Sequence, residues 1–215
     1  MDFTISQSPA SSMPTAADQH REQRAAARGE AGEKELFGIL RHGLDSEEYE
    51  VLSDIMLPDR NDATTQVDFI VVSEYGVFVI EAKNYSGWIF AREKDKVWTQ
   101  TLKENVKNTF PNPIRQNWAH ICALESATGI PKSVMFPVVA FSDRGEFKTN
   151  MPNGVCYFSE VISAIQSKTV PLVKREQVPE IVDAILAWDN TITPEQRAAH
   201  VANLRDRHAK HSSRR

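Results

Sequence analysis

The stretch Thr65–Asn84, with the sequence TQVDFIVVSEYGVFVIEAKN, decides the expected fold. Two runs rich in Val, Ile and Phe, at residues 67–72 and 77–82, are typical of β-strands. The four residues between them, Ser-Glu-Tyr-Gly at 73–76, resemble a tight turn. Two strands joined in this way predict a β-hairpin.

The length of the loop fixes the expected register of the hairpin. If Val72 pairs with Val77, polar residues face each other further along the same two strands. Because side chains alternate between the two faces of a strand, these polar residues share one face, with facing Cβ atoms roughly 5 Å apart. The expected facing pairs are Asp68 with Glu81 and Gln66 with Lys83.

Two facing carboxylates repel each other unless a positive charge lies between them. A hard divalent cation, which prefers oxygen ligands, meets that need at Asp68 and Glu81. Lys83 adds a second positive group. The alternative is that Lys83 only neutralises Glu81 at the edge of a structural sheet. The apolar character of both strands favours function, since buried strands rarely carry charge without a partner or a role.

These residues resemble the active-site signature of the PD-(D/E)xK nuclease superfamily, in which an Asp precedes a Glu-x-Lys motif. The superfamily name has Pro where this chain has Val67, a change that does not touch the chemistry. Further motifs, taken in order, resemble the nuclease-related domain called NERD over about residues 28–142. They are Gly29-x-x-Gly32-Glu33, Gln66-Val67-Asp68, Tyr75–Asn84, Gly87, Trp98 and Asn112-Pro113-x-x-Gln116-Asn117.

The resemblance implies a restriction-endonuclease-like α/β fold, with a mixed central β-sheet flanked by helices. It also implies Mg²⁺-dependent hydrolysis of nucleic-acid phosphodiesters, with Mn²⁺ as a substitute and DNA favoured over RNA. Asp68, Glu81 and the backbone carbonyl of Ala82 would hold the metal. Lys83 would assist the reaction, and Glu33 and Gln116 would complete the site.

A helix expected over residues 21–44 would carry Glu33 on its buried stripe of Leu and Phe side chains. From there Glu33 could reach a metal or accept a hydrogen bond from Lys83. Spacing alone equally allows an exposed first-turn acid that favours the helix dipole. Gly29 and Gly32 would let another backbone approach this helix closely.

A second helix is expected to begin at Asn112 as the N-cap, with Pro113 as its first residue. It would direct Gln116 toward the polar end of the sheet. We interpret His120, one turn later, as a structural or surface residue rather than a catalytic base. Trp88 and Trp98 are expected to pack in the core or across strands rather than to stack on nucleobases.

The remaining segments predict further short elements. The sheet is expected to continue beyond the hairpin, with Lys103–Pro111 left as a polar connection and 143–154 as a flexible loop. The expected strands are 49–55, 88–91, 97–101, 134–141 and 155–158, and the expected helices are 159–167, 176–188 and 194 to about 210.

The length of 215 residues suits one domain with tails. We expect a disordered leader at 1–20, a nuclease-like domain at 21–190, and a helix with a basic tail at 191–215. The last segment carries six cations: Arg197, Arg205, Arg207, Lys210, Arg214 and Arg215. They could follow a phosphate backbone or simply form a solvated end.

The net charge of −4 argues against a broad cationic surface but is compatible with a nuclease, since metal-binding acids contribute negative charge. No apolar run approaches the roughly 20 residues that span a bilayer, and no secretory signal is present. Two cysteines form neither a disulfide framework nor a zinc pattern, which fits a reducing cytoplasm.

Other function classes receive less support. The sequence has no phosphate-binding glycine loop, no Gly-x-Ser-x-Gly elbow and no internal repeat. One alternative is a nucleic-acid-binding or partner-docking module that keeps the fold without turnover. Its partner would be a second copy of the chain or a helicase-type protein. Another is a metal-dependent hydrolase of a nucleotide or other phosphoester.

Overall fold

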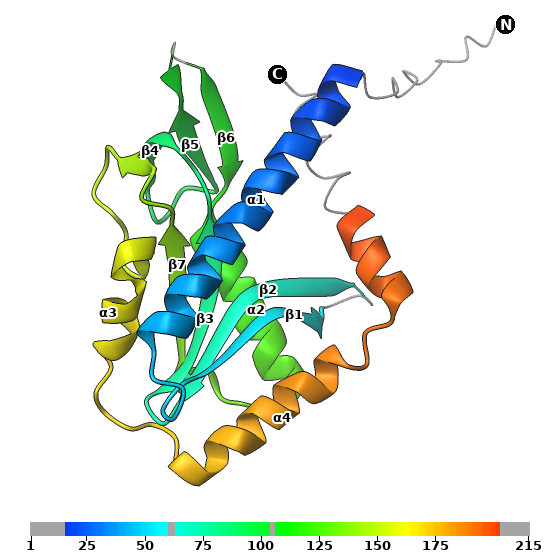
Figure 1. Cartoon of the computed structure of the whole chain (residues 1–215), viewed down its shortest axis with the longest axis vertical. Helices are drawn as coiled ribbons and strands as arrows, with labels where there is room; N and C mark the ends of the chain where they lie inside the picture. Colours follow the sequence, from blue (N-terminus) through cyan, green and yellow to red (C-terminus); the bar gives the residue numbers. More distant parts are fainter. Residues whose placement is uncertain (1–15, 60–62, 104–105, 203–215) are drawn as a thin grey trace, which may run out of the picture.

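The computed structural model describes residues 16–59, 63–103 and 106–202. It contains a five-stranded mixed sheet flanked by helices, which confirms the predicted α/β class (Figure 1). The first sheet has the order β1-β2-β3-β7-β9. Its strands are β1 (Glu50–Pro58), β2 (Thr64–Ser73), β3 (Gly76–Lys83), β7 (Met135–Phe141) and β9 (Val155–Tyr157).

Beyond β3 the chain enters a second sheet of four strands, with the order β6-β5-β4-β8. Its strands are β4 (Gly87–Phe90), β5 (Val97–Thr101), β6 (Lys107–Pro111) and β8 (Gly145–Phe147). The expectation that one sheet simply continues was therefore wrong. The left-handed φ of Gly87, 81°, and the close approach of its backbone to Thr101 mark the turn into the second sheet.

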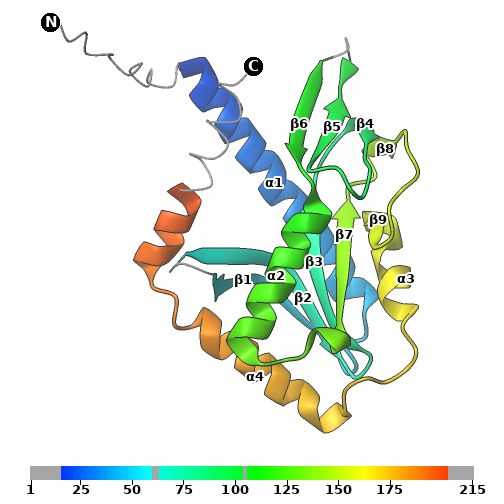
Figure 2. The same ribbon diagram turned by 180° about the vertical axis from the view of Figure 1, so that it is seen from behind.

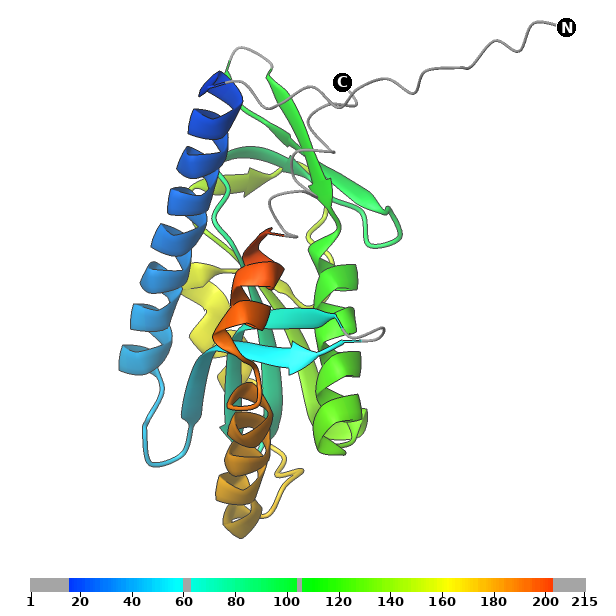
Figure 3. The same cartoon turned by 90° about the vertical axis from the view of Figure 1, so that its right-hand side faces the viewer.

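Helices cover both faces of the first sheet. Residues of α1 and α3 share one core with Phe69 and Phe78, whereas α2 and α4 share another with Ile70 and Val79 (Figures 1 and 2). Figure 3 shows α1 and α2 on opposite sides of the sheet. The helices are α1 (Ala16–Gly43), α2 (Pro113–Thr128), α3 (Val161–Gln166) and α4 (Val178–Asp189), with short 3-10 turns η3 (Lys132–Val134), η4 (Phe158–Glu160) and η5 (Arg175–Gln177). None of the helices described here is long and apolar enough to cross a membrane.

The β2–β3 hairpin has the predicted register, with Val72 paired with Val77. The ladder ends at Phe69 and Ile80, one residue before Asp68 and Glu81. From there β2 continues its pairing with β1 and bends away from β3 (Figure 1). The end of β3 is thus open to groups from other elements.

Gln66 departs from its expected position. It pairs with Met56 of β1, and the β2–β3 ladder does not extend to a Gln66–Lys83 pair. On the other side of β2, Asp54 of β1 has a φ of 57°, in the left-handed region that non-glycine residues seldom adopt.

Strand β3 lies at the centre of the first sheet, because β7 pairs with it in parallel on its other side. Pro137 of β7 lies opposite Val79 and has no N–H for the ladder. The side-chain amide of Asn117 donates to the carbonyls of Val79 and Val138, at 2.9 Å each. Asn117 therefore supplies a donor beside the proline and fixes α2 against the sheet.

Two short strands, β6 and β8, were expected to be a polar connection and a loop. Phe110 is the only fully buried residue of β6, so this strand has little of the alternation that reveals strands in a sequence. Helix α1 begins at Ala16, earlier than the expected residue 21. The first strand also ends later than the expected residue 55, because β1 continues to Pro58.

The helix expected from Pro194 is present as far as residue 202. Thr193 caps it: the Gln196 N–H donates to the Thr193 hydroxyl at 3.2 Å, and the Gln196 side chain accepts from the Thr193 N–H. Residues 1–15 of the expected leader lie outside the described residues. So do five of the six C-terminal cations, Arg205, Arg207, Lys210, Arg214 and Arg215.

Candidate active site

Glu81, near the end of β3, is the most enclosed acid of the candidate site, with 1% of its surface exposed. One carboxylate oxygen, Oε1, forms an ion pair with the Lys83 ammonium. The other, Oε2, lies 3.0 Å from His120 Nε2. Burial alone would raise the pKa of Glu81, but Lys83 and His120 hold this pKa below its usual range. Glu81 is therefore an ionised carboxylate with both oxygens engaged.

Lys83 joins two of the predicted site residues. Its Nζ contacts Glu81 and donates to Gln116 Oε1 at 3.3 Å. Burial disfavours the charged ammonium, yet Glu81 and Asp68 raise the pKa of Lys83 above its ordinary value. Lys83 stays positively charged, with its charge held beside the acids.

Asp68 lies at the point where β2 leaves β3. Its Oδ2 accepts the backbone N–H of Ala82 at 2.8 Å, which ties it to β3 although the ladder has ended. Burial, together with the negative charge of Glu81, raises the pKa of Asp68 well above its usual value. The two acids thus interact strongly, as the sequence predicted from their facing positions.

Glu33 approaches from α1, on the opposite side of the sheet from α2, and is half-buried. Burial raises its pKa, and the charges of Asp54 and Glu81 raise it further. An exposed first-turn acid would not respond to these groups, and Glu33 lies well inside α1. The structure therefore places Glu33 with the other acids.

The two α1 glycines differ. A Cβ on Gly32 would lie 2.4 Å from the Asn84 Cβ, so α1 packs directly on the residue that follows β3. Gly29 has nothing within 4 Å of such a Cβ, so the expected close approach does not occur there. Asn84 also donates to the Arg28 carbonyl at 2.6 Å and accepts from Arg144 at 2.7 Å.

His120, which we interpreted from the sequence as a structural or surface residue, contacts Glu81 of the candidate site. It is buried, and its Nδ1 lies 2.9 Å from Thr65 Oγ1. Because a carboxylate only accepts, Nε2 donates to Glu81 and Nδ1 accepts from the Thr65 hydroxyl in the neutral ring. The available signal was its spacing of one helical turn from Gln116.

Asp54 is a second residue that the sequence analysis missed. Gln66 Nε2 donates to its Oδ1 at 2.6 Å. After burial, Asp54 is the strongest influence on the pKa of Glu33, ahead of Glu81. It is an exposed acid on a distorted part of β1, and its pattern in the sequence is that of an ordinary strand residue.

The oxygen donors at this site suit Mg²⁺ or Mn²⁺, since hard divalent cations prefer carboxylate and carbonyl ligands. Asp68, Glu81 and the Ala82 carbonyl offer such oxygens. Within residues 16–59, 63–103 and 106–202, however, no group of three or more His, Cys, Asp and Glu residues is arranged to hold a metal ion. The Lys83 ammonium occupies Glu81 Oε1, so Lys83 would have to move aside for a metal to bind there.

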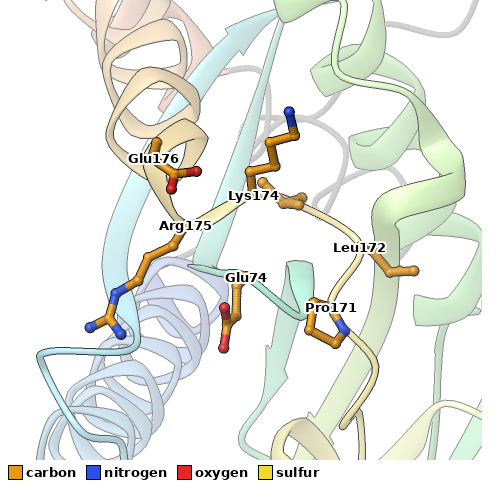
Figure 4. Close-up of a pocket in the computed structure, with 7 residues that line it drawn as sticks. Glu74, Pro171, Leu172, Lys174, Arg175 and Glu176 are labelled. Atoms are coloured by element: carbon orange, nitrogen blue, oxygen red, sulfur yellow. The ribbon is translucent and has the colours of Figure 1, made fainter.

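A hollow of about 540 Å³ lies away from these residues, beside the β2–β3 turn. It is lined by Glu74 and residues 171–176, and Figure 4 shows Lys174 and Arg175 extending in different directions. The Glu74 carbonyl accepts the backbone N–H groups of Leu172 and Val173. These hydrogen bonds anchor the segment before α4. The residues that line the hollow include none of the candidate site residues.

The fold and this cluster define a restriction-endonuclease-like α/β protein. Residues 28–142, just over half of the chain, match the family described as Nuclease-related domain, NERD. The chain belongs to this family, which is part of the PD-(D/E)xK superfamily. It is also similar to an uncharacterized protein of Bacillus anthracis, with 33% identity over 187 residues that cover 85% of this chain and 86% of the relative.

Proposed function

We propose that this protein hydrolyses phosphodiester bonds of nucleic acid, DNA in preference to RNA, with Mg²⁺ or Mn²⁺ as cofactor. The observation that carries the proposal is the position of Lys83. Its ammonium links buried Glu81 to Gln116 beside Asp68, so one cation, two acids and an amide meet where β2 separates from β3. A cluster of this kind, with shifted pKa values, is typical of catalytic sites.

Asp68, Glu81 and the Ala82 carbonyl would hold the metal. When bound, a divalent cation of this kind polarises a phosphoryl oxygen and lowers the pKa of water. Side chains of the protein would position this metal site and the substrate. Thr65 and His120 hold the Glu81 carboxylate in place from β2 and α2.

Lys83 supplies a fixed positive charge where negative charge develops on the phosphate. Gln116 orients Lys83 through its amide oxygen and can donate from its amide nitrogen to a phosphate oxygen. Glu33, whose pKa is raised, retains its proton more readily than an exposed glutamate.

A non-catalytic nucleic-acid-binding or docking module of the same fold is the alternative. It predicts binding without turnover, with a second copy of the chain or a helicase-type protein as the partner. The presence of Asp68, Glu81 and Lys83 together favours turnover, because a lysine held against a buried acid, with a second acid nearby whose pKa is raised, is typical of a catalytic site.

The full-length protein should be incubated with labelled single-stranded and double-stranded DNA and RNA, in Mg²⁺, Mn²⁺ or EDTA. We expect metal-dependent cleavage that is lost in Asp68→Asn and in Glu81→Gln. Cleavage that persists at the parental rate in both variants would identify a contaminating nuclease and contradict the proposal. Binding without cleavage under any metal condition would support the docking module instead.

A further inference from the structure

The outer face of the second sheet carries aromatic residues that are exposed to solvent. Trp88 and Phe90 of β4 are 46% and 40% exposed, whereas Trp98 on the opposite face is buried. Of the two tryptophans expected to pack in the core or across strands, Trp98 lies in the core, whereas Trp88 lies outside it and faces Thr101 of the neighbouring strand. The reason is register: Trp88 and Phe90 share one face of β4, and Ile89 between them enters the core.

These rings border a hollow of about 370 Å³. Thr99 and Thr101 of β5 lie opposite Phe90 and Trp88 in the ladder, and Lys107 of β6 lies opposite Thr101. We call these five residues the aromatic platform. Two threonines and a lysine beside the rings make the platform partly polar.

Thr101, in the wall of this hollow, carries a hydroxyl group that is itself closed off from solvent. The residue is only 6% exposed, and its hydroxyl oxygen is buried. Among the described residues this hydroxyl has no hydrogen-bond partner. Because this oxygen has almost no accessible surface, the contacts of the aromatic platform to a ligand come from its rings and lysines.

Cations stand at the rim of the aromatic platform. Lys148 Nζ lies 4.9 Å from the centroid of the Trp88 ring, a cation–π distance. Lys148 also forms an ion pair with Glu146, the β8 residue opposite Trp88, so part of its charge is already neutralised. Lys107 adds a second, exposed cation. The rim therefore complements a phosphate backbone.

We infer that the aromatic platform binds an unpaired nucleobase, and hence that the substrate of the proposed nuclease includes a single-stranded segment. Base stacking on exposed Trp and Phe, with lysines on the backbone, is how single strands are bound without sequence preference. A paired base inside a duplex offers no free face to such rings. This inference rests on the proposed function for the role it gives the bound strand.

The aromatic platform lies close to the candidate active site along the chain. Trp88 follows Lys83 by five residues, so their Cα atoms are at most about 18 Å apart. The connection is held down, because the Gln100 amide donates to the Ser86 carbonyl at 2.7 Å. A strand stacked on Trp88 could therefore continue to the acids within a few nucleotides.

The test measures binding separately from cleavage. A fluorescein-labelled thymidine oligonucleotide of about 15 residues is titrated in EDTA, and fluorescence anisotropy gives its Kd. We expect Trp88→Ala combined with Phe90→Ala to weaken binding at least about tenfold, given the typical value of base stacking on a ring. Trp88→Phe keeps an aromatic surface and should restore most of the affinity. The matched control is Trp118→Ala.

Trp118 is a suitable control because, like Trp88, it is exposed, at 54%, and has a lysine near its ring, with Lys132 Nζ 6.0 Å from the ring centroid. It belongs to α2 and is not part of the aromatic platform. Circular dichroism and thermal melting establish that each variant is folded. Equal affinity of the double variant and the parent would overturn the inference, as would equal losses in Trp118→Ala. A parent protein that binds duplex DNA but no single strand would also overturn the inference. The aromatic platform would then be a contact surface for a protein partner.

Failure of this inference is distinguishable from failure of the proposed function. If the oligonucleotide binds through Trp88 and Phe90 but no metal supports cleavage, the aromatic platform stands and the nuclease does not. If Mg²⁺-dependent cleavage of duplex DNA is unaffected in the double variant and single strands do not bind, the nuclease stands and the aromatic platform does not.

Discussion

His120 Nε2 lies 3.0 Å from Glu81 Oε2, and this contact orients the most buried acid of the candidate site. The ring is fixed in turn by Thr65, 2.9 Å from its other nitrogen. Three elements, β2, α2 and β3, thus meet at one carboxylate. Lys83 is left on the opposite oxygen, on the side where Gln116 lies.

Replacing His120 should therefore affect both stability and cleavage. In His120→Ala a buried carboxylate oxygen loses its donor, which typically costs about 1–3 kcal/mol. Urea denaturation would measure this loss. His120→Gln retains an amide donor and should recover part of both properties. A His120→Ala protein with parental stability and parental kcat would show that the His120–Glu81 contact contributes to neither folding nor cleavage.

Asp68→Asn should stabilise the metal-free protein at neutral pH. The folded-state pKa of Asp68 is raised, so folding favours its protonated form, and the resulting penalty grows as pH rises above the unfolded value of about 3.9. Asparagine removes this penalty and still accepts the Ala82 N–H. The variant should exceed the parent in melting temperature in EDTA at pH 7, with the difference vanishing below about pH 4.

The same variant should bind Mg²⁺ or Mn²⁺ more weakly, as calorimetric titration would show. Asp183→Asn, an exposed change on α4, is the control and should alter neither property. Unchanged metal affinity in Asp68→Asn would remove Asp68 from the metal site. A lower melting temperature in EDTA would contradict the charge repulsion inferred for the pair.

The hairpin and most of the site could be predicted because they depend on local rules. A four-residue loop and the two-residue period of strands set the register, and this register leads to Asp68 and Glu81 one residue beyond the end of the ladder. Lys83 and Gln116 followed from the family resemblance, and the structure brings them within 3.3 Å. Glu33 could not be assigned from spacing alone, since its environment is created by β1 and β3.

The missed residues depend on contacts between distant segments. His120 acquires its place only when α2 packs on β3, and Asp54 only when β1 distorts. Strand β6 was missed because Phe110 is its only buried side chain. Arg197, counted among cations that could follow a phosphate backbone, forms an ion pair with Asp189 instead. A charge pattern in the sequence does not reveal such a partner.

The two α1 glycines offer a matched pair of substitutions. Gly32→Ala would place its Cβ 2.4 Å from the Asn84 Cβ, forcing α1 and Glu33 away from β3. Overpacking of this kind typically costs about 1–3 kcal/mol. Gly29→Ala meets nothing within 4 Å and should stabilise the helix by up to about 1 kcal/mol. Thermal melting of both variants tests the packing, and equal effects would contradict it.

The substitution Lys83→Met distinguishes the two roles that the sequence left open for this lysine, a structural ion pair with Glu81 and a direct role in the reaction. Methionine keeps the aliphatic length and removes the charge, so buried Glu81 loses a partner and the melting temperature in EDTA should fall. Saturating Mg²⁺ should return part of this stability, because a cation then neutralises Glu81. Lys132→Met breaks the more exposed pair with Glu125 and should lower the melting temperature much less than Lys83→Met does.

The rate of cleavage then decides whether Lys83 acts in the reaction. If it stabilises developing charge on the phosphate, cleavage by the folded, Mg²⁺-saturated variant should fall by several tens-fold or more, which corresponds to about 2–4 kcal/mol of transition-state stabilisation. A purely structural lysine would leave the rate per folded molecule unchanged. Measuring kcat and melting temperature on one preparation provides both values, and parental kcat in a folded, metal-binding Lys83→Met protein would end the catalytic assignment.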